Sequence, residues 1–179
     1  RPLRGGEVLP LAAGGELRVL ATPGHARHHL SFFDTGSRTI FTGDGAGILV
    51  PGARYIRPAV PPPDLDVEDL LRSLDAMGAM GPERIAFSHY GVYPEARARL
   101  REAGEMVRRW ESLALEAARG EPTVASLVRA FSEEEHRRSR ETGEDPGLVA
   151  RAETISALPL AAAGFLRYFR QRGLVPPEA

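Results

Sequence analysis

The sequence predicts an α/β protein of the α+β kind, in which a β-rich first part is followed by helices. Alternating apolar and polar residues, separated by turns rich in Gly and Pro, fill residues 7–44. One amphipathic helix and one short strand follow, at about 66–77 and 84–88. Helical periodicity then dominates residues 94–172. We therefore expect a layered domain in which helices pack on a sheet.

The first part of the chain is predicted to contain four short strands. Gly14 and Gly15 supply the turn between the first two strands. The last two are expected to pair antiparallel through the three-residue connection 35–37, with Gly36 at the position that needs a positive φ. The four strands are expected at residues 7–10, 16–20, 29–34 and 38–42.

A stretch rich in glycine and proline, residues 45–63, is predicted to be a long irregular loop. Loops of this length within a compact domain often carry function. Because the loop begins directly after Asp44, we expect it to cover whatever Asp44 binds. Tyr55 and Arg57 are the side chains in it that are best suited to contact a substrate, and packing within the loop is the alternative explanation for both.

Each predicted helix has a signal at its start and one apolar face. Asp64 or Asp66 is expected to cap the first helix, Pro94 to open the second and Thr123 to cap the third. The residues expected on the buried faces are Val67, Leu70, Leu71, Leu74 and Met77 in the first helix, Leu100, Ala103, Val107, Trp110, Leu113 and Ala117 in the second, and Val124, Leu127, Val128 and Phe131 in the third.

The C-terminal part continues the helical pattern. A run of mixed charge over residues 133–141 is expected to be a solvated helix end, and a loop follows at 143–147. A last helix is predicted over residues 148–172, bent at Pro159 and ended by Gly173.

The composition restricts the possible partners. Hydrophobic residues make up 42% of the chain and the net charge is −1, which argues against a nucleic-acid partner or an anionic membrane. No apolar run approaches the roughly 20 residues of a membrane-spanning helix and no signal-peptide pattern is visible, so we expect a cytoplasmic protein.

The absence of cysteine excludes disulfides, thiolate metal sites and cysteine nucleophiles. Any metal must be held by His, Asp, Glu or main-chain groups, which favours zinc, iron or manganese.

Three potential metal ligands, His25, Asp44 and His89, each stand at the end of a predicted strand beside a small or turn residue. Strand ends on one edge of a sheet lie close together, so residues far apart in sequence can meet there. Neutral imidazoles bind zinc-class metals, and one carboxylate can bridge two metals about 3.5–4 Å apart. Such a metal pair acidifies a shared water and polarises a carbonyl or phosphoryl oxygen. These residue types therefore indicate a binuclear site bridged by Asp44.

Three motifs surround these residues in order: Thr22-Pro23-Gly24-His25 with His29, then Phe41-Thr42-Gly43-Asp44, then Ser88-His89-Tyr90-Gly91. Over residues 7–91 the sequence resembles the metallo-β-lactamase superfamily, in which the corresponding His, Asp and His are metal ligands. The resemblance implies a hydrolase with two divalent metal ions, zinc first and iron or manganese as alternatives. A metal-bound hydroxide would then attack an ester, thioester, amide or phosphoester of a small-molecule substrate. It implies catalytic and metal-binding roles for His25, Asp44 and His89.

One signature of that family is missing from the sequence. Its His-x-His-x-Asp-His motif, which supplies ligands to both metals, has no counterpart before His25. The family fold is an αββα sandwich of two similar halves, so we interpret residues 1–92 as its C-terminal half and 93–179 as a helical C-terminal subdomain. The expected partner is the N-terminal half of the same fold. The alternatives are a fragment or degenerate, non-catalytic member that serves in binding or assembly, and an iron-dependent redox member.

The other histidines have simpler interpretations. His29, the second histidine of the first motif, is expected to hydrogen-bond behind the ligands rather than bind metal directly. We expect His28 to pack or to face solvent, and His136 to be solvated within the charge run. Tyr90 is a further candidate for substrate contact, with loop packing as its alternative.

Overall fold

The structure of the chain is a computed structural model that describes residues 2–12, 14–89 and 91–177, without the side chains of 152–156. Six strands in these residues form one sheet whose strand order follows the chain. Neighbouring strands are antiparallel except β4 and β5, which are parallel. The strands are β1 (Val8–Pro10), β2 (Glu16–Ala21), β3 (Leu30–Asp34), β4 (Thr39–Phe41), β5 (Arg84–Phe87) and β6 (Gly91–Pro94).

Three strands, β2, β4 and β5, run in the same direction. Both β2 and β4 are antiparallel to β3, and β4 is parallel to β5. Their C-terminal ends therefore lie at the same edge of the sheet. Each is followed by one of the predicted ligands, with His25 after β2, Asp44 after β4 and His89 after β5.

Two helices cover one face of the sheet. Phe33, Ile40 and Ile85 are paired across the central strands, so their side chains share that face. They are buried in one core cluster with Leu74 and Leu100, which come from the two helices. The helices are α1 (Val67–Ala79) and α2 (Ala96–Gly120).

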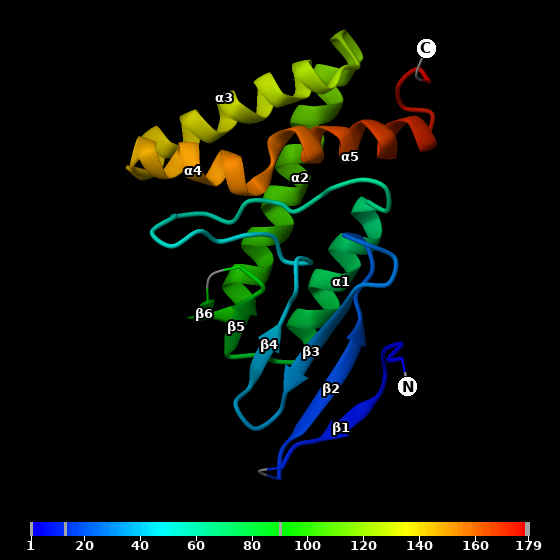
Figure 1. Cartoon of the computed structure of the whole chain (residues 1–179), viewed down its shortest axis with the longest axis vertical. Coiled ribbons are helices and arrows are strands. Elements are labelled where there is room, and N and C mark those ends of the chain that lie inside the picture. Colours follow the sequence, from blue (N-terminus) through cyan, green and yellow to red (C-terminus); the bar gives the residue numbers. More distant parts are fainter. Residues whose placement is uncertain (1, 13, 90, 178–179) are drawn as a thin grey trace.

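The remaining helices form a second layer beyond the strand ends (Figure 1). They are α3 (Val124–Thr142), α4 (Pro146–Ser156) and α5 (Leu158–Gln171). Helix α2 belongs to both layers, because its first half packs on the sheet through Leu100 and its second half contributes Trp110 to a core with Phe131, Phe165 and Phe169. The Trp110 and Phe131 rings stack with centroids 4.4 Å apart. Segment 45–63 runs between the two layers in Figure 1.

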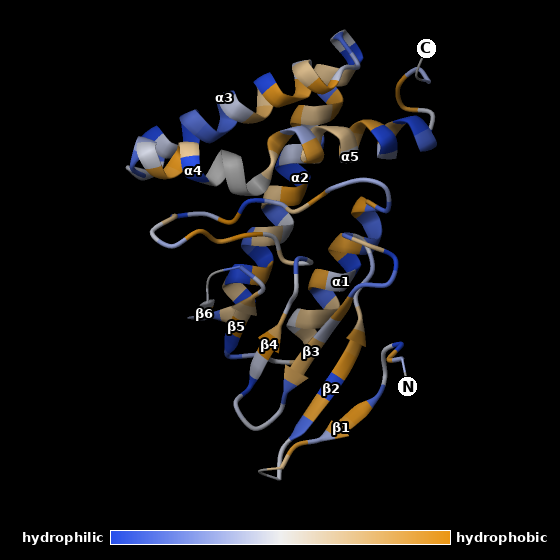
Figure 2. Ribbon diagram, viewed as in Figure 1, coloured by the Kyte–Doolittle hydropathy of each residue, from blue (hydrophilic) through white to orange (hydrophobic). Residues whose placement is uncertain are grey.

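The opposite face of the sheet is apolar and partly open. The cross-strand pairs Val19–Phe32 and Phe32–Phe41 place these side chains on the face away from α1 and α2. Leu17 and Phe32 line a shallow apolar depression on it, together with Phe41, which is 42% exposed. Val92 on β6 is 57% exposed. Strands β1 to β3 are accordingly largely orange in Figure 2.

The predicted strands and caps are present with small shifts. Asp66 caps α1 by accepting a hydrogen bond from the Asp69 N–H at 2.9 Å, and Thr123 caps α3. The turn between β3 and β4 differs from the prediction: it has four residues, 35–38, and the positive φ of 51° lies at Arg38 rather than Gly36. Five residues expected on buried faces are instead partly or largely exposed, namely Leu71, Leu113, Ala117, Val124 and Val128.

The sequence did not predict β6, which spans Gly91–Pro94 and pairs with β5. Val92 and Tyr93 favour a strand, and Pro94 is tolerated because it ends an edge strand. The helix therefore begins at Ala96 rather than Pro94. The boundary that we expected between residues 92 and 93 falls inside this strand.

Two expectations for the C-terminal part were wrong. Residues 133–141 are not simply a solvated helix end, because Glu134 and Glu135 are buried with 4% and 0% exposure. The predicted last helix is two helices, separated at Ala157, whose φ is 47°. Pro159 lies in the first turn of α5, where its missing N–H leaves no helical bond unmade. Among the described helices, none is long and apolar enough to cross a membrane.

Candidate metal centre

The three residues predicted as ligands come together at the C-terminal edge of the sheet. The Nε2 atom of His25 lies 3.8 Å from Asp44 Oδ2, and the Nε2 atom of His89 lies 3.3 Å from Asp44 Oδ1. One carboxylate therefore faces a different imidazole with each oxygen. The side chains are 16%, 36% and 46% exposed for His25, Asp44 and His89, so the site opens toward solvent on the His89 side.

The orientation of His25 is fixed by the irregular segment that follows Asp44. Its Nδ1 atom lies 2.8 Å from the carbonyl oxygen of Ala59. Because a carbonyl oxygen can only accept, Nδ1 carries the proton and donates it to this bond. The neutral ring then has its lone pair on Nε2, which faces the Asp44 carboxylate. This is the tautomer that a metal ligand needs.

Asp44 lies in a tight turn between two glycines. The Ser88 hydroxyl donates a hydrogen bond to Asp44 Oδ1. A Cβ at Gly43 would lie 2.6 Å from Nε2 of His29, and one at Gly45 would lie 2.9 Å from Cε1 of the same ring. The two glycines therefore make room for the His29 imidazole.

His29 packs directly behind the site. Its Nδ1 atom lies 3.0 Å from the Thr22 carbonyl oxygen and 2.9 Å from the Thr22 hydroxyl, which in turn contacts Ser31. The rings of His25 and His29 meet edge to face, with centroids 5.7 Å apart. Burial lowers the pKa of His29 and the neighbouring His25 ring lowers it further, so the His29 imidazole is neutral at pH 7.

The donors match a zinc-class metal in kind but not in number. Imidazole nitrogen and carboxylate oxygen are the ligands that such metals use. Across the described part of the chain, however, no group of three or more His, Cys, Asp or Glu side chains is arranged so that it could hold a metal ion by itself. His25, Asp44 and His89 therefore offer donors of the right kind but, among the described residues, too few to enclose a metal ion.

Two of the residues predicted to contact a substrate, Tyr55 and Arg57, are not at this site. Tyr55 and Arg57 are buried with 1% and 0% exposure and bond to the helical layer, so the structure gives them no surface to offer a substrate. Tyr90 lies outside the described residues. His28 and His136 are both exposed.

Three groups at the site were not found from the sequence. Ser88 stands next to His89 in the third motif, so its proximity to Asp44 was readable in principle. Thr22 likewise belongs to the first motif and holds His29. The Ala59 carbonyl gives no signal in the sequence, because every residue presents the same main-chain oxygen whatever its side chain.

Comparison with known proteins gives a consistent assignment. The sequence profile of the metallo-beta-lactamase superfamily matches residues 3–89. A metallo-beta-lactamase fold-containing protein of Sulfurisphaera tokodaii is 35% identical over 79 residues, which are 44% of this chain and 28% of the relative. The chain thus spans well under two thirds of that relative.

Two solved structures extend the comparison. An archaeal metallo-beta-lactamase superfamily protein from Sulfolobus tokodaii has a TM-score of 0.50 and 29% identity, over 62% of this chain and 39% of that chain. A metallo-beta-lactamase family protein from Thermus thermophilus has a TM-score of 0.64 and 24% identity, over 96% of this chain and 49% of that chain. The second shows that the fold, helical layer included, recurs in a larger protein. Residues 3–89 of the chain belong to the metallo-beta-lactamase superfamily.

Proposed function

We propose that this chain supplies one side of the active site of a metal-dependent hydrolase. The observation that supports it is the arrangement around Asp44, whose two carboxylate oxygens face Nε2 of His25 at 3.8 Å and Nε2 of His89 at 3.3 Å. An aspartate with an imidazole on each oxygen is the donor set for two metal ions bridged by one carboxylate.

The residues of the chain have separate roles in this proposal. Asp44 would hold both metal ions, and His25 and His89 would each hold one of them. When bound, the metal pair would supply a Lewis acid and an acidified water for attack on an ester, thioester, amide or phosphoester of a small molecule. The Ala59 carbonyl keeps the His25 lone pair on Nε2, and Ser88 orients the Asp44 carboxylate. Zinc suits these donors, with iron or manganese as alternatives.

The remaining ligands would come from outside these 179 residues, on the second half of the same fold. The apolar open face of the sheet supports this part of the proposal. Phe32 and Phe41 share that face, and Phe41 is 42% exposed. Apolar strand faces are normally covered by another layer. A second sheet packed there would bury Phe41 and lie beside the strand ends that carry the candidate ligands.

The experiment uses the full-length protein. Metal content is measured by mass spectrometry, and hydrolysis is assayed on chromogenic esters, thioesters, amides and phosphodiesters with zinc, manganese or iron(II). We expect Asp44→Asn to lower metal content and to reduce hydrolysis by more than about 100-fold. This is a larger loss than the roughly 10- to 100-fold that follows when only a hydrogen-bond partner of a metal ligand is removed. His28→Gln is the control, because the His28 side chain is exposed and is not one of the candidate ligands. Wild-type hydrolysis by Asp44→Asn would refute the assignment.

The same measurements separate the alternatives. Full-length protein that retains no metal and hydrolyses none of these substrates would point to a non-catalytic member that serves in binding or assembly. Iron retention together with oxygen consumption would point to redox chemistry on the same scaffold.

A further inference from the structure

A buried charge cluster joins the irregular segment after Asp44 to the helical layer. At its centre is Arg57, which has no exposed surface. Its Nε donates to Glu135 Oε2 at 2.7 Å, and its Nη2 donates to Glu144 Oε2 at 2.8 Å. The Tyr55 hydroxyl accepts from Arg57 Nη2 at 2.9 Å and donates to Glu135 Oε2 at 2.9 Å. The cluster therefore links one loop to α3 and to the turn after it.

Glu144 is itself held in place by further hydrogen bonds, and Glu135 is fully buried beside Arg57. The second oxygen of Glu144 accepts a hydrogen bond from the Arg54 N–H at 2.8 Å, and its main chain bonds to Ser139 in α3. Burial raises the pKa of Glu135, and the neighbouring Arg57 opposes that rise. Removal of one partner of such a buried ion pair strongly destabilises the folded protein, because the other charge stays buried without a counter-charge. The cluster accordingly fixes Arg57 in a single position.

Arg57 is two residues from the carbonyl that orients His25. Pro58 lies between them and restricts the main chain through its fixed φ, so Ala59 has little freedom relative to Arg57. Ala59 then accepts the hydrogen bond from His25 Nδ1 at 2.8 Å. Arg57 also forms a two-way main-chain bridge with Ile48, at 2.8 and 2.9 Å, close after Asp44.

The other end of this segment is held as well. Val60 is buried against α5, and a Cβ placed on Gly164 would overlap the Val60 carbonyl oxygen. The main chain of α5 and of segment 57–60 are therefore in direct contact. Ala59 lies between the Arg57 cluster and this contact. On both sides the partners come from the helical layer, namely Glu135 of α3 and Gly164 of α5.

We propose that Arg57 is a positioning residue for His25. Through Pro58 and the Ala59 carbonyl, the cluster of Arg57 with Glu135, Glu144 and Tyr55 keeps the His25 ring in one orientation and one tautomer. The helical layer thereby sets the direction of a ligand lone pair. The link from the cluster to the ring stands on the contacts above, and its importance for catalysis rests on the proposed function.

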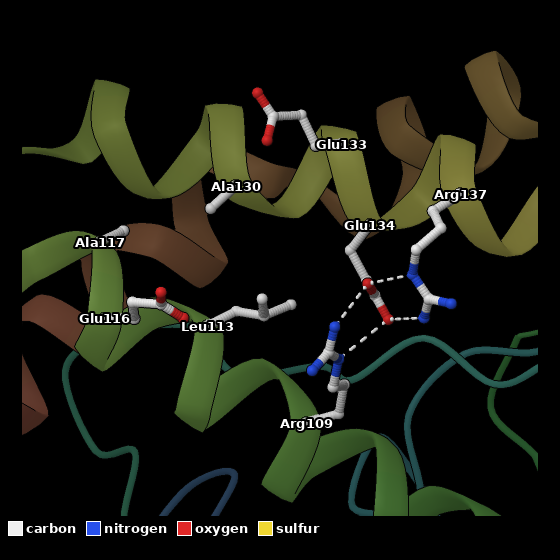
Figure 3. Close-up of a pocket in the computed structure, with 8 residues that line it drawn as sticks. All are labelled: Arg109, Leu113, Glu116, Ala117, Ala130, Glu133, Glu134 and Arg137. Atoms are coloured by element: carbon white, nitrogen blue, oxygen red, sulfur yellow. Dashed lines mark hydrogen bonds and ion pairs between the residues drawn. The ribbon is translucent and has the colours of Figure 1, made fainter.

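A second charge cluster on α3 provides a matched control. Glu134 is next to Glu135 in sequence and is 4% exposed, but it points to the groove between α2 and α3 (Figure 3). There it accepts hydrogen bonds from Arg109 at 3.1 and 3.0 Å and from Arg137 at 2.9 and 2.6 Å. Neither arginine belongs to segment 45–63. Loss of Glu134 should therefore cost stability without disturbing His25.

The experiment compares Glu135→Met with Glu134→Met in the metal-free full-length protein labelled with ¹⁵N-histidine. Methionine keeps the approximate length of glutamate and removes its charge and acceptors. Long-range ¹H–¹⁵N spectra identify the tautomer of His25, and the exchange of its Nδ1–H with water reports how firmly the Ala59 bond is kept. In Glu135→Met we expect the exchange of the His25 Nδ1–H to become about tenfold faster or more, which is the fold-change for the loss of a buried charged hydrogen bond. We also expect a mixture of His25 tautomers. Glu134→Met should match the wild type.

Circular dichroism and thermal unfolding first establish that both variants are folded. If Glu135→Met does not fold, Tyr55→Phe takes its place, because it removes only the hydroxyl between Arg57 and Glu135 and should still raise the exchange rate. A wild-type His25 tautomer and exchange rate in the folded variant overturns the proposal, and so does an equal change in Glu134→Met. The readout needs neither metal nor substrate. Absence of hydrolysis in the full-length protein with a changed His25 signal would therefore count against the proposed function alone.

Discussion

Replacement of Gly164 by alanine should destabilise the protein although the residue lies in a helix. In an unobstructed helix, Gly→Ala stabilises by up to about 1 kcal/mol. At Gly164 the new Cβ would overlap the Val60 carbonyl oxygen and come within 3.1 Å of the Pro61 carbonyl carbon. Overpacking costs about 1–3 kcal/mol, and the upper end applies because main-chain atoms cannot rotate away as a side chain can. The expected net loss is therefore about 2 kcal/mol.

Thermal and urea unfolding of Gly164→Ala and Gly104→Ala measure this difference. Gly104 lies inside α2, and its Cβ would meet Arg108 Nη1 at 3.4 Å and Leu71 Cδ2 at 3.7 Å, both flexible side-chain ends. At roughly 2–4 °C per kcal/mol for a chain of this size, the Tm should fall by about 4–8 °C for Gly164→Ala and rise by up to about 4 °C for Gly104→Ala. If Gly164→Ala unfolds at or above the wild-type temperature, α5 does not contact segment 58–61 as closely as the structure shows.

Two further predictions concern charge and capping. The hydrogen bonds from Arg137, with those from Arg109, lower the pKa of Glu134 to about 2, whereas an unfolded glutamate titrates near about 4.3. Its contribution to stability is therefore complete above about pH 4.3 and is lost as the pH falls toward about 2, so Glu134→Gln should lose less stability than the wild type between pH 6 and pH 3 in urea unfolding. Thr123 accepts the Ser126 N–H at 3.2 Å as the cap of α3, and Thr123→Ala should cost about 1 kcal/mol. Thr142→Ala, which removes a hydroxyl bonded within the helix to Arg138, is the comparison and should cost less.

The strand ends and the site geometry were predictable from local sequence. Turn residues place His25 and Asp44 directly after apolar strands, and parallel strands bring such positions to one edge. That reasoning needs no knowledge of side-chain packing. It succeeds for His25, Asp44 and His89 because the positions of strand ends, rather than contacts made by particular side chains, bring them together.

Arg57 shows where local reasoning fails. An arginine in a loop rich in glycine and proline suggested an exposed contact residue. Its partners Glu135 and Glu144 lie 78 and 87 residues further along the chain. They lie in a charged run that suggested a solvated helix end. Neither the loop sequence nor the charged run indicates burial by itself. Arg57 can be buried only beside the two glutamates, and only the fold brings these residues together.

Together these contacts give the helical layer a role at the site. Segment 57–60 is held at Arg57 by the carboxylates of α3 and the following turn, and at Val60 by the backbone of α5. Between these two points lies the Ala59 carbonyl that orients His25. If the helical layer were attached only through α2, neither Arg57 nor the Ala59 carbonyl that bonds His25 would be held in place by α3 and α5. The sheet thus determines where the candidate ligands lie, and the helices determine how one of them, His25, is oriented.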